Sequence, residues 1–330
     1  MSVKRVLGFV CLMAVAMAAR DLEIYAIDVE GGKSTLYISP SGQTMLIDAG
    51  YGGFEDRDAK RIAAVLKLAS VKQIDFLVVT HFHSDHVGGV PRIAEMIPVK
   101  QFIDHGKSYE KTPGKIYDDY AALRDKSKHT LAEAGYRIPI KGMDVEVVTG
   151  SGKGITKPLA GAGDSNPTCT SYKAMEQDPG ENAHSLGMIM TYGKFRLADL
   201  GDLFWNQEFD LACPTNKLGT VDVYMTTHHG TGSSGAPQIV NALHPRVAIM
   251  NNGAKKGGSV EALKTIHASP GLEDLWQLHY SLAGGKEQNT GEQFIANPEE
   301  KCAGNWLRLT ARADGTFTVY NSRNKFEKTY

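Results

Sequence analysis

One ten-residue segment, 80–89, constrains the fold of this chain more than any other, and it reads Thr-His-Phe-His-Ser-Asp-His-Val-Gly-Gly. It follows the apolar run 74–79, which predicts a buried strand. His81 and His83 lie two residues apart, so both imidazoles point to the same side of an extended strand end. The two final glycines allow a tight turn into a helix. The segment therefore predicts a strand-to-helix loop that presents polar side chains at one edge of a sheet.

The side chains of this loop are of the types that bind metal ions. Four of them fall within six residues: His81, His83, Asp85 and His86. Neutral imidazole and carboxylate groups suit zinc. Asp85 and His86 lie in the turn beyond the strand end, where they can face a second cation. A run of surface histidines is the alternative, and the density of the group directly after a buried strand disfavours it.

Further residues of the same types adjoin later apolar runs that predict strands. They are His184, Asp202, His228 and His229. Upstream, Asp48 follows the short apolar run 45–47. This repetition is expected when one site is built from the ends of several strands. Two lone histidines, His105 and His279, are interpreted as packing residues, with contact to a substrate as the alternative.

The H-x-H-x-D-H pattern of residues 81–86, together with these later residues, resembles the metallo-β-lactamase superfamily. The resemblance implies an α/β fold, a four-layer αββα sandwich with the metals at one edge between the sheets. It implies a first metal site made of His81, His83 and His184. It implies a second metal site made of Asp85, His86 and His228, with Asp202 bridging the two metals.

The resemblance also implies supporting residues and leaves two alternatives open. Asp48 is expected to support the ligand loop. Asn182 is the alternative to His184 in the first site. His228 is preferred to His229 because it is nearer to the strand end, and His229 would then support it or face the substrate.

Two divalent metal ions are the implied cofactors, with zinc expected first and manganese or iron as alternatives. Cations about 3.5–4 Å apart can share a hydroxide and stabilise both the attacking and the leaving oxygen. Asp202 as the bridge and Asp85 as a group that orients the hydroxide are the expected catalytic residues. No serine or cysteine nucleophile is needed, so the expected class is a metal-dependent hydrolase.

Asp202 also narrows the range of substrate classes that the resemblance implies. True zinc β-lactamases have no aspartate at this position, so the resemblance favours the branch with phosphodiesterases, nucleases, lactonases and thioesterases. Within it, residues 22–252 are most similar to the hydrolase domain of ComEC-type DNA-uptake proteins. The chain departs from that group at residues 251–258, which lack its His-Pro pair, and this puts nuclease activity in doubt. Lys255 and Lys256 in this segment could contact a phosphate, although such lysines more often form a solvated turn.

Three functions from different classes remain open. The first is a hydrolase of phosphodiesters, and the second is a hydrolase of another ester or amide, such as a lactone, thioester or β-lactam. The third is a non-enzymatic, metal-stabilised binding protein that uses the glycine-rich loop 150–167 as an interface. The formal net charge of −1 provides no general attraction for nucleic acid, so that partner has no support from charge. The oligomeric state is not predicted.

Residues 1–18 predict a secretory signal peptide. Lys4 and Arg5 precede the apolar run 6–18, which ends in a small-x-small cleavage pattern and is too short to span a membrane. An uncleaved anchor is the alternative. Cleavage after Ala18 would remove two basic residues, take the formal charge from −1 to −3, and leave a periplasmic or secreted protein without a membrane segment.

Residues 19–330 are expected to form one domain with a C-terminal β extension, since 42% hydrophobic content is enough for a large core. In an oxidising compartment, Cys169, Cys213 and Cys302 predict one disulfide and one free thiol, with all three pairings open. Strands are expected at 22–29, 34–39, 44–48, 74–80, 144–149 and 247–251, and in a hairpin of 306–311 with 317–321. Helices are expected at 58–70, 91–97, 117–134 and 259–267.

Overall fold

The structure is a computed structural model that describes residues 20–112 and 114–330. The predicted signal peptide, 1–18, lies outside the described residues. Within the described ranges, no helix has the length and apolar character needed to cross a membrane.

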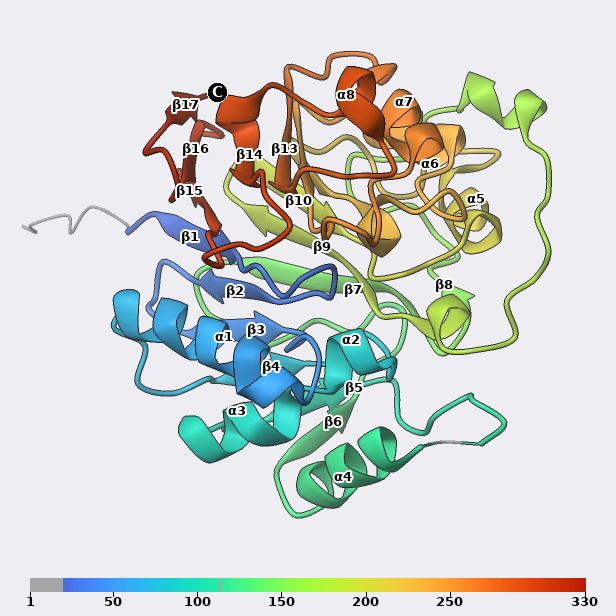
Figure 1. Ribbon diagram of the computed structural model, residues 1–330. Coiled ribbons are helices and arrows are strands. Elements are labelled where there is room, and N and C mark those ends of the chain that lie inside the picture. Colours follow the sequence, from blue (N-terminus) through green and yellow to red (C-terminus); the bar gives the residue numbers. More distant parts are fainter. Residues whose placement is uncertain (1–19, 113) are drawn as a thin grey trace, which may run out of the picture.

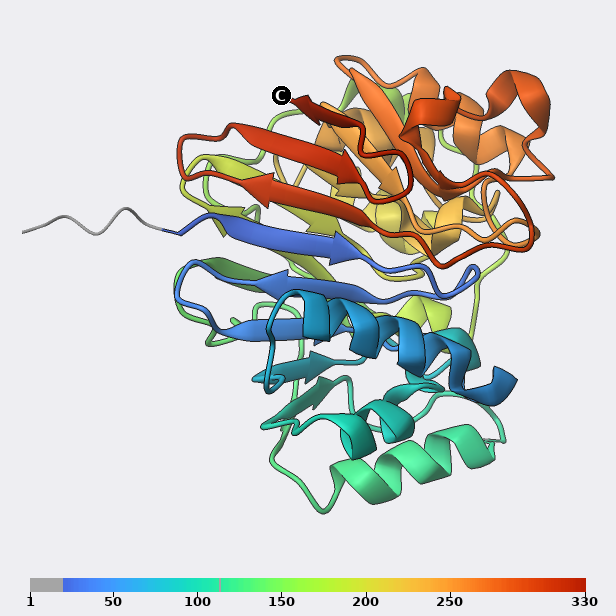
Figure 2. The ribbon, with the colours of Figure 1, turned by 60° about the vertical axis from the view of Figure 1, so that its left-hand side comes forward.

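Two β-sheets form the centre of the described part of the chain (Figure 1). The first has nine strands in the order β17-β16-β15-β1-β2-β3-β4-β5-β6. Its strands are β1 (Leu22–Ala26), β2 (Thr35–Ile38), β3 (Thr44–Ile47), β4 (Phe76–Val78), β5 (Phe102–Asp104), β6 (His129–Leu131), β15 (Leu307–Ala311), β16 (Phe317–Asn321) and β17 (Glu327–Thr329). The β3–β6 strands run parallel to one another, and the C-terminal hairpin adds antiparallel strands to β1 (Figure 2).

The second sheet has eight strands in the order β14-β13-β12-β11-β10-β9-β7-β8. They are β7 (Asp144–Gly150), β8 (Lys153–Gly154), β9 (Gly187–Tyr192), β10 (Phe195–Asp199), β11 (Val223–Met225), β12 (Val247–Met250), β13 (Asp274–His279) and β14 (Ile295–Asn297). The β10–β14 strands are parallel. Parallel strands deliver the loops that follow them to the same edge of a sheet, and that edge is where α/β folds place their sites.

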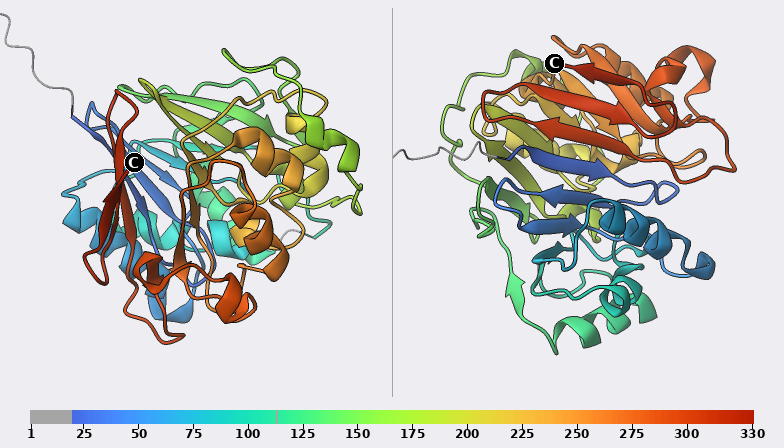
Figure 3. Two further views of the ribbon diagram at one scale, coloured as in Figure 1. Left: turned by 90° about the horizontal axis from the view of Figure 1, so that it is seen from above. Right: turned by 90° about the vertical axis from the view of Figure 1, so that its left-hand side faces the viewer.

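Helices cover the outer face of each sheet, so the layers follow the order α, β, β, α (Figure 3). On the side of the first sheet lie α1 (Arg57–Leu68), α2 (Ser84–Val87), α3 (Val90–Met96) and α4 (Lys115–Arg124). On the side of the second lie α5 (Trp205–Ala212), α6 (Pro237–Leu243), α7 (Val260–His267) and α8 (Gly285–Gln288). The α/β sandwich that the sequence predicts is confirmed.

The largest apolar core lies between the two sheets. Alternate residues of the strands point inward, among them Ile24 and Val78 from the first sheet and Met190 and Val223 from the second. Separate apolar clusters lie under the helices on each outer face, for example where Ile62 of α1 packs on the first sheet. The strand ends that carry the polar residues are therefore supported from both sides.

The expected helix over 117–134 is wrong in its second half. Helix α4 ends at Arg124, and residues 129–131 form strand β6 beside β5. Backbone pairing along the edge of β5 satisfies the hydrogen-bonding groups of this segment, which a local helical pattern does not reveal. Strands β13 and β17 were not predicted either.

Cys169 and Cys213 form a disulfide, and Cys302 is a free thiol. The bond joins the long excursion between β8 and β9 to the end of α5. This selects one of the three pairings that the sequence left open.

Candidate metal centre

Four buried side chains converge where the two sheets meet. Asp85 and His86 lie in α2, directly after β4, while Asp202 follows β10 and His229 follows β11. One ligand atom from each of the four lies within 4.8 Å of those of the others. His86 Nε2 is 3.1 Å from Asp202 Oδ2, and His229 Nε2 is 3.1 Å from Asp85 Oδ2. We call these four residues the central cluster.

The central cluster has the chemistry of a divalent-cation site. His86 Nε2 and His229 Nε2 are only 3.3 Å apart, and both nitrogens also face the carboxylates of Asp85 and Asp202, so the four groups point at one place. Asp202 is 2% exposed, and its Oδ1 has no hydrogen-bond partner among the described residues. Buried polar atoms without partners are costly, and a bound cation would satisfy them. The donor set of two imidazoles and two carboxylates fits zinc and similar metals.

The ionisable groups in and beside the central cluster shift one another's pKa values. Burial would raise the pKa of Asp202, but the charges of His229 and His86 outweigh burial and hold the pKa well below its usual range. Burial lowers the pKa of His228 to about 4, so this imidazole is neutral near pH 7. Burial would lower the pKa of His86, but the charges of Asp202 and Asp85 outweigh burial and raise it well above its usual range. Metal binding requires neutral imidazoles, so a bound cation would displace the proton of His86.

Three further predicted ligands lie around Asp202 or beside one another. Asp202 Oδ2 is 3.9 Å from His81 Nε2 and 3.6 Å from His228 Nε2. His81 Nε2 lies 3.1 Å from His83 Nδ1. The Asp202 carboxylate thus has imidazoles of the central cluster on one side and His81 and His228 within 4 Å, an arrangement compatible with the bridging role expected for it.

His184 lies outside the central cluster, in a short 3₁₀ helix before β9. Its ring stacks on Tyr109 with centroids 3.5 Å apart, and its Nδ1 is 2.6 Å from the backbone oxygen of Gly180. An Nδ1–H that donates to a carbonyl leaves Nε2 unprotonated, which is the tautomer of a metal ligand. Asn182, the alternative, has a buried Oδ1 without a hydrogen-bond partner in the described ranges. Both residues stay candidates for the first site.

The geometry reverses the expected order of His228 and His229. His229 is fully buried and belongs to the central cluster, whereas the His228 ring stacks on Phe204 and its Nδ1 lies 3.0 Å from Ser234 Oγ. The reason is local: strand β11 ends at Met225, and both histidines have positive φ, 51° and 56°. The chain has left the extended conformation before it reaches them, so distance from the strand end does not decide which ring points inward.

Asp48 connects the strand end of β3 to the ligand loop. It accepts hydrogen bonds from the backbone N–H of Thr80 (2.8 Å) and from the Thr80 hydroxyl (2.7 Å). Its Oδ2 also lies 2.8 Å from His86 Nδ1. Asp48 therefore orients His86 so that Nε2 faces the central cluster, as carboxylates do for metal-binding histidines.

Two lysines near the site have roles that the sequence did not reveal. Lys256 pairs with Asp85 and lies over the Tyr51 ring, 5.6 Å from its centroid. Lys255 points away instead and pairs with Glu300 at the surface. Lys33 is 1% exposed, pairs with buried Asp199, and its backbone N–H donates to the backbone oxygen of Asp85. The sequence indicates Lys255 and Lys256 as candidate phosphate contacts, but it reveals neither the pairing of Lys256 with Asp85 nor the role of Lys33. These pairings join loops far apart in the chain, which no local signal reveals.

One family model matches part of the chain. Residues 27–174 match the sequence model described as "Metallo-beta-lactamase superfamily". This matched segment is similar to that superfamily and makes up less than half of the chain. It includes Asp48 and the histidine motif and ends before His184. A search of curated proteins found no match.

Several solved structures are similar to the described fold. The metallo-β-lactamase fold protein YhfI from Bacillus subtilis is 10% identical, with 78% of this chain and 96% of that chain covered and a TM-score of 0.44. Igni18, a metallo hydrolase from the archaeon Ignicoccus hospitalis, is 16% identical, with 80% and 97% covered and a TM-score of 0.41. The diiron β-hydroxylase CmlA from Streptomyces venezuelae is 13% identical, with 78% and 48% covered and a TM-score of 0.41.

Proposed function

We propose that this chain is a metal-dependent hydrolase that acts on an anionic ester, with a phosphodiester as the first candidate. The observation that carries the proposal is the buried central cluster with the Lys256 ammonium in contact with Asp85. The cluster supplies the donors that a divalent cation needs. The ammonium adds a positive charge at the same place, which favours a negatively charged substrate over a neutral one.

Each side chain has a definable task. Asp85, His86, Asp202 and His229 would hold one cation. The candidates for a second are His81 and His228 beside Asp202, His83 beside His81, and His184 or Asn182. Divalent metal ions, when bound, act as Lewis acids that lower the pKa of water toward about 7. Asp48 holds the His86 ring in place through its contact with Nδ1. Lys256 would pair with an anionic group of the substrate.

The rest of the substrate would occupy a cavity that lies one residue away from His184. Its volume is about 980 Å³, and its lining includes Tyr109, the residue on which His184 stacks. Residues 150, 151 and 153–160 form another part of the wall, so the glycine-rich loop of the sequence borders a cavity. Lys107 and Lys153 at its rim supply positive charge that suits an anionic ester.

Turnover of bis(p-nitrophenyl) phosphate by zinc- or manganese-loaded protein tests the proposal. We expect hydrolysis that a chelator and Asp202→Ala both abolish, because each removes a cation or its ligand. Asp210→Ala, which changes an exposed aspartate on α5, is the matched control and should remain active. A protein that carries two metals per chain and does not turn over the diester would overturn the phosphodiester assignment. Lactones, thioesters and β-lactams would then be tested.

Nucleic acid enters this proposal only through the resemblance to ComEC-type hydrolase domains. Oligonucleotides are therefore the second substrate to test, after the small diester is shown to react. We also propose a periplasmic or secreted location, which the Cys169–Cys213 disulfide supports because such bonds persist in oxidising compartments. N-terminal sequencing of protein from cell fractions would test it, and a cytoplasmic chain that keeps residues 1–18 would contradict it.

A further inference from the structure

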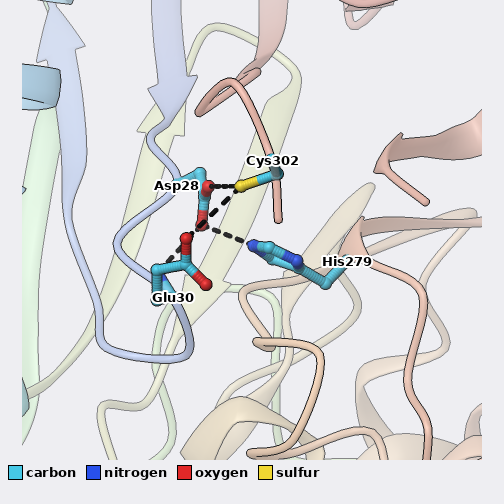
Figure 4. A group of neighbouring side chains, drawn as sticks. All are labelled: Asp28, Glu30, His279 and Cys302. Atoms are coloured by element: carbon cyan, nitrogen blue, oxygen red, sulfur yellow. Dashed lines mark hydrogen bonds and ion pairs between the residues drawn. The ribbon is translucent and has the colours of Figure 1, made fainter. Parts of the chain in front are cut away.

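A second group of metal-ligating side chains lies outside the central cluster (Figure 4). Asp28 and Glu30 come from the β1–β2 loop, His279 ends β13, and Cys302 lies between β14 and β15. One ligand atom from each of the four lies within 4.8 Å of those of the others. The β1–β2 loop and two segments more than 200 residues further along the chain therefore bring oxygen, nitrogen and sulfur donors to one point.

The spacing of these donors matches a tetrahedral metal site. His279 Nε2 is 2.7 Å from Asp28 Oδ1, and Cys302 Sγ is 3.1 Å from Asp28 Oδ2 and 3.3 Å from Glu30 Oε1. Bond lengths of about 2.0 Å to oxygen or nitrogen and 2.3 Å to sulfur place the ligands of a tetrahedral zinc roughly 3.3–3.5 Å apart. The two Cys302 distances would change by a few tenths of an ångström on zinc binding, and the His279–Asp28 distance would lengthen by about 0.6 Å, which side-chain torsions can supply.

The burial of this group makes an uncompensated charge in it costly. Asp28 and His279 are fully buried, and the Glu30 side chain is 22% exposed. His279 Nδ1 has no hydrogen-bond partner in the described part of the chain. Charges in such a place need compensation by an opposite charge or a metal ion.

Arg61 supplies part of that compensation. Its guanidinium donates to Asp28 Oδ2 (2.7 Å), Glu30 Oε1 (3.0 Å) and Cys302 Sγ (3.4 Å). One positive charge against two carboxylates leaves a negative charge, which a bound cation would balance. With Cys302 as a thiolate, a divalent cation and Arg61 together give a neutral group. Each carboxylate oxygen has two lone pairs and can accept from Arg61 while it binds a metal.

We propose that Asp28, Glu30, His279 and Cys302 bind a structural divalent transition metal ion, zinc by preference. Four protein ligands of the N, O and S types leave no open position, which is characteristic of structural rather than catalytic zinc. The ion would fasten the β1–β2 loop to β13 and to the segment before β15. The same loop carries Lys33, whose N–H donates to the Asp85 backbone oxygen (3.0 Å). This site does not depend on the proposed hydrolase activity.

Cobalt substitution of the full chain tests the proposal, because the central cluster contains no cysteine. Cobalt–thiolate bonds give a strong charge-transfer absorption in the near ultraviolet, and Cys302 is the free cysteine of the described residues. We expect this absorption in the cobalt-loaded protein and its loss in Cys302→Ser, with the loss of about one metal equivalent per chain by elemental analysis. In contrast to Cys302→Ser, the Asp202→Ala variant should keep the thiolate absorption and lose metal from the central cluster.

A second variant distinguishes the loss of a metal ligand from the loss of the folded structure. His279→Gln keeps a polar side chain of similar size and should also lose one metal equivalent, while its near-ultraviolet circular dichroism stays that of a folded protein. If the cobalt protein shows no thiolate absorption and Cys302→Ser keeps the full metal content, the proposal is overturned. The group is then a metal-free network in which Arg61 compensates part of the carboxylate charge.

Discussion

At the scale of single residues, Glu181 links the histidine motif to the loop before α4. Its carboxylate accepts from the backbone N–H groups of Phe82 (2.9 Å) and Tyr109 (2.6 Å) and lies 3.1 Å from His105 Nε2. Burial would raise the pKa of Glu181, but the hydrogen bond and charge of His105 and the two N–H donors lower it to about 2. Glu181 thus holds the backbone of the motif in place beside the ligands.

This shift predicts a pH-dependent stability. Because the folded pKa is depressed from 4.5 to about 2, the contribution of Glu181 is present above about pH 4.5 and is lost as pH falls toward 2. Glu181→Gln should lower the free energy of unfolding near pH 7 by about 2–3 kcal/mol and show less of the acid-induced loss. Urea unfolding of chelator-treated protein near pH 7 and about pH 3 measures both. Exposed Glu299→Gln is the control, and an equal acid slope in wild type and Glu181→Gln would contradict the assignment.

Lys256 and Lys255 make a matched pair of single-residue variants. Lys256→Ala removes the ammonium at Asp85. We expect kcat/KM for an anionic diester to fall about 10- to 100-fold, because one hydrogen bond to a charged group contributes about that much to transition-state stabilisation. Lys255→Ala removes a surface ion pair with Glu300 and should change kcat/KM less than about twofold. Steady-state kinetics gives kcat/KM for each variant, and metal content is measured in parallel. Together they distinguish weaker substrate binding from loss of bound metal. Equal activities of the two variants would exclude a role for Lys256.

At the scale of elements, the β1–β2 loop packs against the ligand helix α2 through glycine. A Cβ added at Gly32 would lie 2.5 Å from the backbone oxygen of Asp85, closer than such atoms approach. Gly32→Ala should therefore push α2 away, with a cost of about 1–3 kcal/mol in unfolding free energy and a loss of bound metal. Gly114→Ala, where nothing lies within 4 Å, is the control. Chemical unfolding and metal analysis give both readouts, and normal metal binding by Gly32→Ala would show that this contact does not position Asp85.

At the scale of the whole molecule, the Cys169–Cys213 disulfide closes a loop across 44 residues. The chain-entropy model assigns a loop of this length about 4 kcal/mol of stability. Replacing both cysteines with alanine, or adding a reductant, should lower the free energy of unfolding by up to that amount. The reductant should have no further effect on the double variant in urea unfolding. A reductant effect of the same size in that variant would place the sensitivity elsewhere.

Much of the architecture could be predicted because its signals are local. The apolar run before the motif became β4, the amphipathic pattern near residue 60 became α1, and the terminal hairpin formed as expected. The second half of the expected 117–134 helix could not be predicted, since its strand forms only by pairing with β5. Periodicity reports what a segment favours alone, and edge strands are decided by their neighbours.

For the site, the sequence by itself determined which residues are candidates. The close spacing of His81 to His86 holds the side chains of the motif near one another in any compact fold, and Asp202 and the His228–His229 pair carry the right chemistry. Only the tertiary structure decided that His229 rather than His228 enters the central cluster, that Lys256 reaches Asp85, and that Cys302 meets Asp28. The physical reason is distance along the chain: contacts within a few residues follow from local backbone geometry. Contacts between segments hundreds of residues apart depend on how two sheets pack, which no short pattern encodes.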